Sequence, residues 1–227
     1  MNQCIAYSTN GKREFIETTQ TEWAAKWNEK VMYYSIGICK SLTNQELKKA
    51  LNLAFSTWEA EIDIKFHPAK VGQKPNFTVE FKSSAQDELF KKSPSILAYA
   101  YFPGQGQESG HLVFNDDYIW SLSGKQVTVK KAKENGFPVL GTPLDTQLLR
   151  TYKIITVLIH ELGHSLGLRH DEHGDSDDAM DAYYDGKDDL SKWDIFRIRL
   201  KYPERAFKKG RYDDFKRSIL KIIKSFQ

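Results

Sequence analysis

The spacing of apolar residues predicts several short strands in the first half of the chain. Residues 31–39 are rich in Val, Tyr and Ile, as strands are. Apolar and polar side chains alternate over 62–66 and again over 77–81, which predicts two further strands. The apolar run over 95–102 predicts another, and Pro103-Gly104 ends it.

A helix is predicted directly after the first strand. Thr43 and Glu46 have the spacing of a capping box, in which each side chain accepts a hydrogen bond from a free backbone N–H of the first turn. Apolar residues then recur on one helical face from Leu47 to Trp58. The order strand, helix, strand, strand predicts an α+β fold with a mixed sheet and a helix packed against it.

The second half of the chain is less regular. Residues 121–150 contain three glycines, two prolines and four lysines, and we predict a long surface loop there. Asp145 is a candidate N-cap for a helix that runs to about Leu166.

Length and composition limit the class of protein. With 227 residues, of which 40% are hydrophobic and 28% charged, the chain can bury one core of ordinary size. Its longest apolar runs span only a few residues, so we expect no transmembrane segment. Residues 1–25 are polar and weakly patterned, and we interpret them as an N-terminal extension. They contain no apolar stretch of the kind found in secretory signals, so we expect no such signal.

The charge is unevenly distributed. A net charge of +3 is too small to imply a nucleic-acid partner, and we expect none. Eight basic and three acidic residues lie within 204–227, so the rest of the chain is slightly negative. Apolar residues follow helical spacing in this basic amphipathic tail. We expect it to pack on the body, and binding to an anionic surface is the alternative.

The candidate chemistry is concentrated in the segment HELGHSLGLRH, which begins at His160. His160 and His164 lie four residues apart, so on a helix both imidazoles project from one face and can bind one zinc ion. Glu161 lies beside them, where a general base is needed. Gly167 can end the helix in the left-handed conformation, so that the chain turns back and His170 supplies a third ligand. A fourth position left for water is typical of a catalytic zinc site.

The alternative is a helix without a metal site, whose histidines are ordinary hydrogen-bonded side chains. It would require three histidines, a glutamate and a helix-ending glycine to fall at the needed places by chance. We therefore favour a catalytic zinc site, in which Glu161 is placed to take a proton from metal-bound water.

The same segment resembles the extended zinc signature of the metzincin metalloendopeptidases. Met180, ten residues after His170, resembles the methionine of their Met-turn. Within this clan the likeness is greatest to the matrixins, the matrix metalloproteinase family, and it runs from about Lys26 to Tyr202. It implies a metzincin-like α+β catalytic domain with a twisted mixed sheet, one antiparallel edge strand, two main helices, and a small C-terminal subdomain holding the Met-turn and a helix. The chain would then divide into an extension (1–25), a protease domain (26–203) and a tail (204–227), and we expect a monomer.

The resemblance also implies how substrate binds. The edge strand with Ala98, Tyr99 and Ala100 would hold an extended protein or peptide by strand addition. Tyr184 stands where matrixins have the tyrosine that walls the specificity pocket. For both tyrosines, plain packing is an equal alternative.

Several features depart from the matrixin pattern. Matrixins usually carry a second, structural zinc, and of its ligands only His111 has a counterpart here; Ser84-Ala85-Gln86 and Ile155 stand at other ligand positions. We therefore expect one catalytic zinc ion and no structural one. No PRCG-type inhibitory motif is present. Cys4 could in principle bind the zinc of a latent form, but we expect an ordinary thiol.

Three other interpretations stay open. The aspartates between 171 and 189 could bind calcium, but they lack EF-hand spacing, and we expect a solvated acidic loop. The chain could be a zinc-binding module without activity. It could also bind nucleic acid or membranes through 125–133 and the tail, with strong salt dependence. Matrixins are usually secreted, but with no signal seen we assign no location.

Overall fold

The computed structural model describes residues 3–8, 25–139, 143–171, 178–182 and 186–203. The 204–227 tail and Tyr184 therefore lie outside the described residues. Within the described parts, no helix is both long and apolar enough to cross a bilayer.

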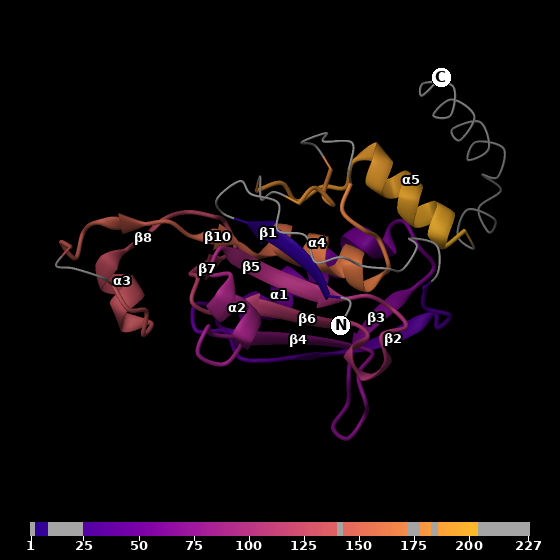
Figure 1. Ribbon diagram of the computed structural model, residues 1–227, viewed down its shortest axis with the longest axis horizontal. Coiled ribbons are helices and arrows are strands. Elements are labelled where there is room, and N and C mark those ends of the chain that lie inside the picture. The colour runs from indigo at the N-terminus through magenta and orange to yellow at the C-terminus, as the bar shows by residue number, and fades with distance from the viewer. Residues whose placement is uncertain (1–2, 9–24, 140–142, 172–177, 183–185, 204–227) are drawn as a thin grey trace.

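A six-stranded mixed sheet forms the frame of the molecule (Figure 1). In spatial order its strands are β1 (Gln3–Ser8), β5 (Ile96–Tyr101), β6 (His111–Asn115), β4 (Phe77–Lys82), β2 (Val31–Ile36) and β3 (Lys65–Pro68). Strands β3, β2, β4 and β6 are parallel, whereas β5 is antiparallel to β6. The predicted α+β fold with an antiparallel strand near one edge is confirmed. Strand β1, which the sequence did not predict, pairs with the outer side of β5.

Two long helices pack against each other and against the sheet. Helix α1 (Asn44–Glu59) begins with the predicted capping box, since Thr43 Oγ1 accepts from the Glu46 N–H at 3.3 Å and Glu46 accepts from the Thr43 N–H at 2.9 Å. Its apolar face contacts helix α4 (Ile154–Ser165). Trp58 is fully buried between them, and its Nε1 donates to the carbonyl of Ile159 at 3.0 Å. The core therefore attaches α1 directly to the histidine-bearing helix.

A smaller apolar cluster involves β5 and its neighbours. Phe90 of the short helix α2 (Glu88–Lys92) packs with Ile96, Tyr99 and Val113. Asp87 caps α2 and also accepts a hydrogen bond from the Tyr99 hydroxyl at 2.7 Å. The Tyr99 side chain is thus a packed core residue.

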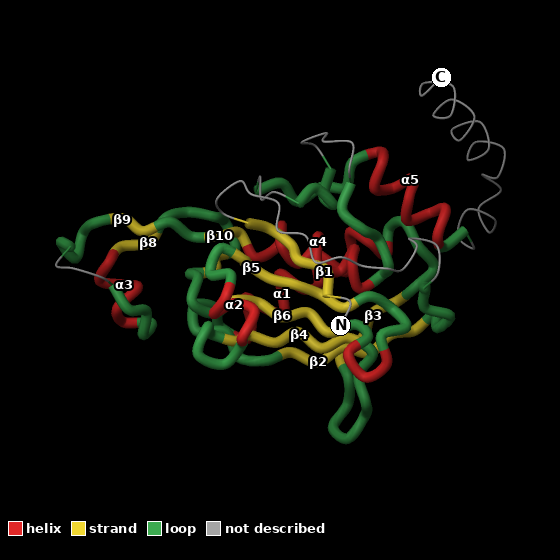
Figure 2. Tube along the Cα trace, in the orientation of Figure 1, coloured by secondary structure: helices red, strands yellow, loops and turns green. Residues whose placement is uncertain are grey.

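Residues 121–139 and 143–150 belong to an arm that extends away from the sheet (Figure 2). It contains β8 (Val127–Thr128), α3 (Val129–Glu134) and β9 (Leu148–Leu149), and β7 (Trp120–Ser121) and β10 (Tyr152–Lys153) pair at its base. The prediction of one long loop was therefore wrong in part, because these paired elements are too short to give a periodic pattern. The predicted Asp145 cap was also wrong, since α4 begins at Ile154 with Lys153 as its N-cap.

A single-turn helix, η1 (Gly106–Glu108), precedes β6.

The last described helix is α5 (Lys192–Lys201). Ser191 and Asp194 form a second capping box at the start of α5, which satisfies free backbone N–H groups there.

Candidate metal centre

Helix α4 places two histidines in the interior. All of its residues are buried, and His160 and His164 have no exposed surface. Gly167 ends the helix with a φ of +98°, the left-handed conformation in which glycine is favoured. A Cβ at Gly167 would lie 2.7 Å from the carbonyl oxygen of Ala25, so a larger residue would collide with the backbone there. The reversed chain brings His170 back to the other two histidines.

The three imidazoles converge on one point. His170 Nε2 lies 3.1 Å from both His160 Nε2 and His164 Nε2. Three nitrogens about 2.0–2.1 Å from a tetrahedral zinc ion would be separated by roughly 3.3 Å. Within the described ranges, these histidines form the one cluster of three or more side chains with ligand atoms close enough to share a metal ion.

Backbone carbonyls orient two of these rings. His160 Nδ1 lies 2.7 Å from the carbonyl oxygen of Ala179, and His164 Nδ1 lies 2.7 Å from that of Leu168. A carbonyl oxygen only accepts, so each Nδ1 carries the proton and each Nε2 keeps its lone pair toward the centre. Burial, together with the neighbouring imidazoles, lowers the pKa of both His160 and His164 well below its ordinary value. Neutral imidazoles with inward Nε2 atoms are the form that binds zinc.

Glu161 is the other reactive side chain of the centre, besides the three histidines. It is completely buried, and no described donor hydrogen-bonds either of its carboxylate oxygens. Burial raises its pKa well above the ordinary value of a glutamate. A buried carboxyl group without a partner is costly, and such groups are common where a proton must be held and released.

Met180 packs against the helix that carries His160 and His164. It is fully buried beside Gly163, which lies between Glu161 and His164 in α4. A Cβ at Gly163 would lie 2.2 Å from Met180 Sδ and 3.0 Å from the Trp58 ring. Glycine in a helix interior is unfavourable, so the close approach of these two side chains explains its presence.

Asp194 ties helix α5 to the Met180 turn. Its carboxylate accepts hydrogen bonds from the N–H groups of Ala179 at 2.7 Å and Met180 at 3.3 Å. Ala179 in turn offers its carbonyl to His160. Burial raises the pKa of Asp194, and the backbone donors act in the opposite direction. Asp194, at the start of α5, therefore helps to orient His160 indirectly, through the backbone of Ala179.

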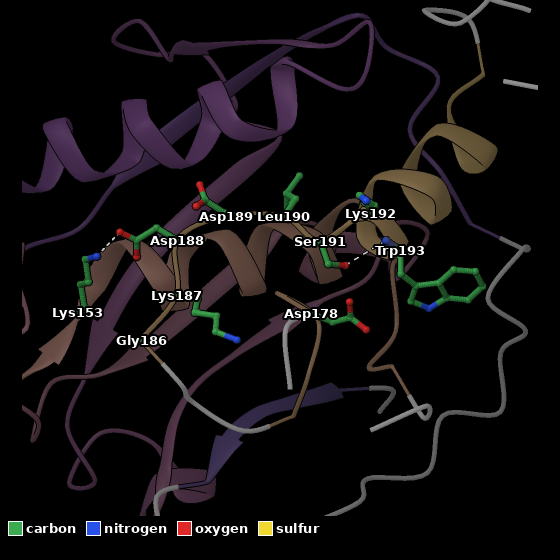
Figure 3. Close-up of a pocket in the computed structure, with 10 residues that line it drawn as sticks. All are labelled: Lys153, Asp178, Gly186, Lys187, Asp188, Asp189, Leu190, Ser191, Lys192 and Trp193. Carbon is green, nitrogen blue, oxygen red and sulfur yellow. Dashed lines mark hydrogen bonds and ion pairs between the residues drawn. The ribbon is translucent and has the colours of Figure 1, made fainter. Parts of the chain in front are cut away.

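A pocket lies beside this support, between the start of α4 and the start of α5 (Figure 3). It is lined by Lys153, Asp178 and residues 186–193, and by none of the three histidines. Asp188 pairs with Lys153 and accepts from the Thr156 hydroxyl at 2.7 Å, which fastens the loop to α4. Burial and a hydrogen bond with Asp171 raise the pKa of Asp178 to about 7.

The remaining predicted residues lie as follows. Ala98, Tyr99 and Ala100 are buried in β5, between β1 and β6. His111 starts β6, away from the triad, with Nδ1 3.5 Å from the Glu108 carboxylate. Sequence reasoning missed Gly163, Trp58 and Asp194 as supports; the interior glycine was the one available signal.

Comparison with known proteins places the chain in a family. A family model described as matrixin matches residues 26–202. Karilysin of Tannerella forsythia is 26% identical over 184 residues, which cover 76% of this chain and 33% of karilysin. Matrilysin of Felis catus is 28% identical over 188 residues (80% and 61%), and matrix metalloproteinase-25 of Homo sapiens is 28% identical over 149 residues (64% and 22%). The chain therefore matches less than two thirds of the length of each of these relatives. Since the family model covers most of the chain, this protein belongs to the matrixin family of zinc metalloendopeptidases.

Proposed function

We propose that this chain is a zinc-dependent endopeptidase that hydrolyses peptide bonds in extended polypeptides. The observation that carries the proposal is the convergence of three imidazoles beside a buried glutamate, with His170 Nε2 3.1 Å from the Nε2 atom of each of the other two. A structural zinc site would be closed by a fourth protein ligand, whereas here the described ligand atoms number three.

The donor set fits zinc. His160, His164 and His170 would hold the ion through Nε2, because the Nδ1 atoms of the first two are engaged by backbone carbonyls. Zinc bound there would supply Lewis acidity, which lowers the pKa of water and polarises a carbonyl group. We propose one catalytic ion and no structural ion.

Glu161 is proposed as the proton carrier. Its oxygens accept no hydrogen bond from any described residue, so they are available to a water molecule and then to a leaving amine. Burial raises the pKa of Glu161, which favours the protonated carboxyl group that must form during the reaction.

The backbone of β5 is the proposed binding surface for substrate. Because the Tyr99 side chain packs in the core, contact with a peptide at Ala98, Tyr99 and Ala100 would run through main-chain N–H and C=O groups. A role for Tyr184 in the specificity pocket stays a prediction.

Hydrolysis of casein and of a mixed peptide library tests the proposal. Zinc-loaded protein should cleave, a chelator should abolish cleavage, and added zinc should restore it. The Glu161→Gln variant should lose at least about 10³-fold in kcat while keeping its zinc, because the general base is absent but the ligands remain. Zinc binding at full occupancy without cleavage by the native chain would instead indicate an inactive binding module.

A further inference from the structure

The turn that brings His170 to the metal centre contains buried backbone carbonyls. Helix α4 ends at Ser165, and residues 166–169 connect it to His170. The last carbonyl groups of a helix have no partner within the helix. Ser165 and Leu166 are fully buried, and a buried carbonyl without a hydrogen bond is costly. These carbonyls therefore need donors from other parts of the chain.

Two side chains far apart in the sequence supply these donors. Trp27 Nε1 donates to the carbonyl of Ser165 at 2.7 Å, and the Tyr202 hydroxyl donates to that of Leu166 at 2.9 Å. The Tyr202 hydroxyl also accepts from the Trp27 N–H at 3.1 Å, so the two residues support each other. Tyr202 directly follows helix α5, whose end lies beside the C-terminal end of α4 (Figure 1).

Arg197 of α5 holds the last carbonyl before the ligand. Its side chain is buried, and its Nη2 atom donates to the carbonyl of Arg169 at 2.8 Å. A guanidinium group is never deprotonated in proteins, so this donor is always available. The Arg169 carbonyl belongs to the planar peptide bond that leads into His170. Fixing this plane restricts where the His170 backbone can lie.

The middle of the turn is closely packed as well. A Cβ at Gly167 would collide with Lys201 Cε and would lie 2.7 Å from the carbonyl oxygen of Ala25. The end of α5 and the segment before Trp27 therefore both pack against the turn, and the same two segments supply its hydrogen-bond donors.

We infer that Arg197 and Tyr202 are positioning residues for the third zinc ligand, His170, and that they act through the backbone of the turn. The inference rests on the proposed function in one respect, namely that His170 is a zinc ligand. Helix α5 then supports two ligands, because its start orients His160 and its second half orients His170. Holding the turn removes conformations in which His170 lies away from the other histidines, so zinc binds more tightly.

The test compares two arginines of α5. Arg197→Met removes the donor and keeps an unbranched side chain in the buried position. The control Arg199→Met makes the same change at an arginine that pairs with Glu61. Competition with a chelator measures the zinc Kd of each full-length variant. We expect Arg197→Met to weaken zinc binding about tenfold or more and Arg199→Met to leave it unchanged.

The sign of the effect separates positioning from charge. Two cations repel, so a guanidinium group that acted by its charge alone would weaken zinc binding, and its removal would tighten it. Loss of a positioning hydrogen bond has the opposite effect. Unchanged or tighter zinc binding by Arg197→Met would therefore overturn the inference.

A double-mutant cycle shows whether Arg197 acts through His170. In the His170→Ala background the turn no longer brings a ligand to the centre, so Arg197→Met should change the zinc Kd by less than about twofold. An equal loss of affinity in both backgrounds would show a general effect on the fold and would count against the inference.

Tyr202→Phe keeps the inference testable if Arg197→Met does not fold. It deletes one hydroxyl group and keeps the ring. Loss of this hydrogen bond to a buried carbonyl should weaken zinc binding about threefold to tenfold, and only when His170 is present. An unchanged zinc Kd in Tyr202→Phe would overturn the inference.

A further readout needs neither zinc nor substrate. Diethyl pyrocarbonate modifies accessible imidazoles, and peptide mass spectrometry gives the rate at each histidine of the zinc-free protein. We expect His170 to react several times faster in Arg197→Met than in the native chain, and His111 to react equally fast in both. Equal rates at His170 would contradict the inference. If the native chain bound no zinc or cleaved no peptide, the proposed function would fail, and these rates would still decide the role of Arg197.

Discussion

Two regions of this molecule contain histidines at positions where matrixins bind zinc, and they differ in what holds the side chains. At the centre, His160 and His164 are fully buried and their Nδ1 atoms contact backbone carbonyls. At the start of β6, the His111 side chain is 30% exposed, and it contacts Glu108 and the Tyr101 ring. In the first region buried rings share one centre, whereas the His111 ring is partly exposed and, within the described residues, belongs to no cluster of metal-binding side chains.

The loop after β4 lies at the other end of β6 from His111, and hydrogen bonds hold its backbone. At the positions where matrixins have a His-x-Asp pair, the Ser84 N–H donates to Asp117 at 2.7 Å and the Ser83 N–H donates to Gln86 at 3.1 Å. Gln86 of this loop and Asp117 of the turn after β6 thus fix this backbone. From this comparison we expect zinc to bind where several imidazoles have fixed orientations, because partners of metal ligands change the affinity by about one to two orders of magnitude.

Removing one histidine from each region is the strongest way to break the comparison. His170→Ala should weaken zinc binding at least about 100-fold, because one of three ligands is lost. His111→Ala should leave the affinity unchanged. Competition with a zinc chelator measures both; equal losses in the two variants would show that the regions are not different in kind.

Replacing one glycine by alanine in each region sharpens the comparison. Gly163→Ala forces a Cβ against Met180 and Trp58, and Gly110→Ala forces one to 2.2 Å from the carbonyl oxygen of Asn76. Both should lower the free energy of unfolding by about 1–3 kcal/mol, through overpacking in the first and strain in the second. Only Gly163→Ala should also weaken zinc binding, because it displaces the Met180 turn.

A double variant checks the assigned cause. If the Gly163 methyl group collides with Met180, then Gly163→Ala/Met180→Ala should be more stable than the sum of the two single effects, because the second change makes room for the first. Strict additivity in urea unfolding would assign the loss to Trp58 or to another contact.

The smallest effect is expected from pH. The pKa of Asp178 is raised from its ordinary value of 3.8 to about 7 in the folded state, by burial and its hydrogen bond with Asp171. A carboxyl group with a raised folded-state pKa contributes stability that is complete below pH 4 and is lost as pH rises toward 7. Asp178→Asn removes this titration, so its stability relative to the native chain should increase between pH 4 and pH 7. Urea unfolding of the zinc-free proteins measures it, and parallel pH profiles would refute the assignment.

The sequence predicts the parts of this structure that depend on local spacing. The capping box at Thr43, the helical face from Leu47 to Trp58 and the reversal at Gly167 each follow from a few neighbouring residues. The zinc signature belongs to this class, since its five defining positions lie within eleven residues.

What the sequence does not predict depends on contacts between distant segments. The pairing of β1 with β5 joins residues 88 to 98 positions apart, in a stretch without apolar alternation. The backbone of Ala179 orients His160 through its carbonyl and is itself held by the carboxylate of Asp194. Contacts made by a backbone group leave no pattern of side chains in the sequence. The arm at 121–150 is built from two-residue strands, which are too short to show a period.

Anomalous diffraction at the zinc absorption edge, from crystals grown with zinc, tests the central claim most directly. The account predicts one strong peak, bonded to the Nε2 atoms of His160, His164 and His170, and no peak at His111. Absence of density between the three imidazoles, or a peak of equal height at His111, would contradict it.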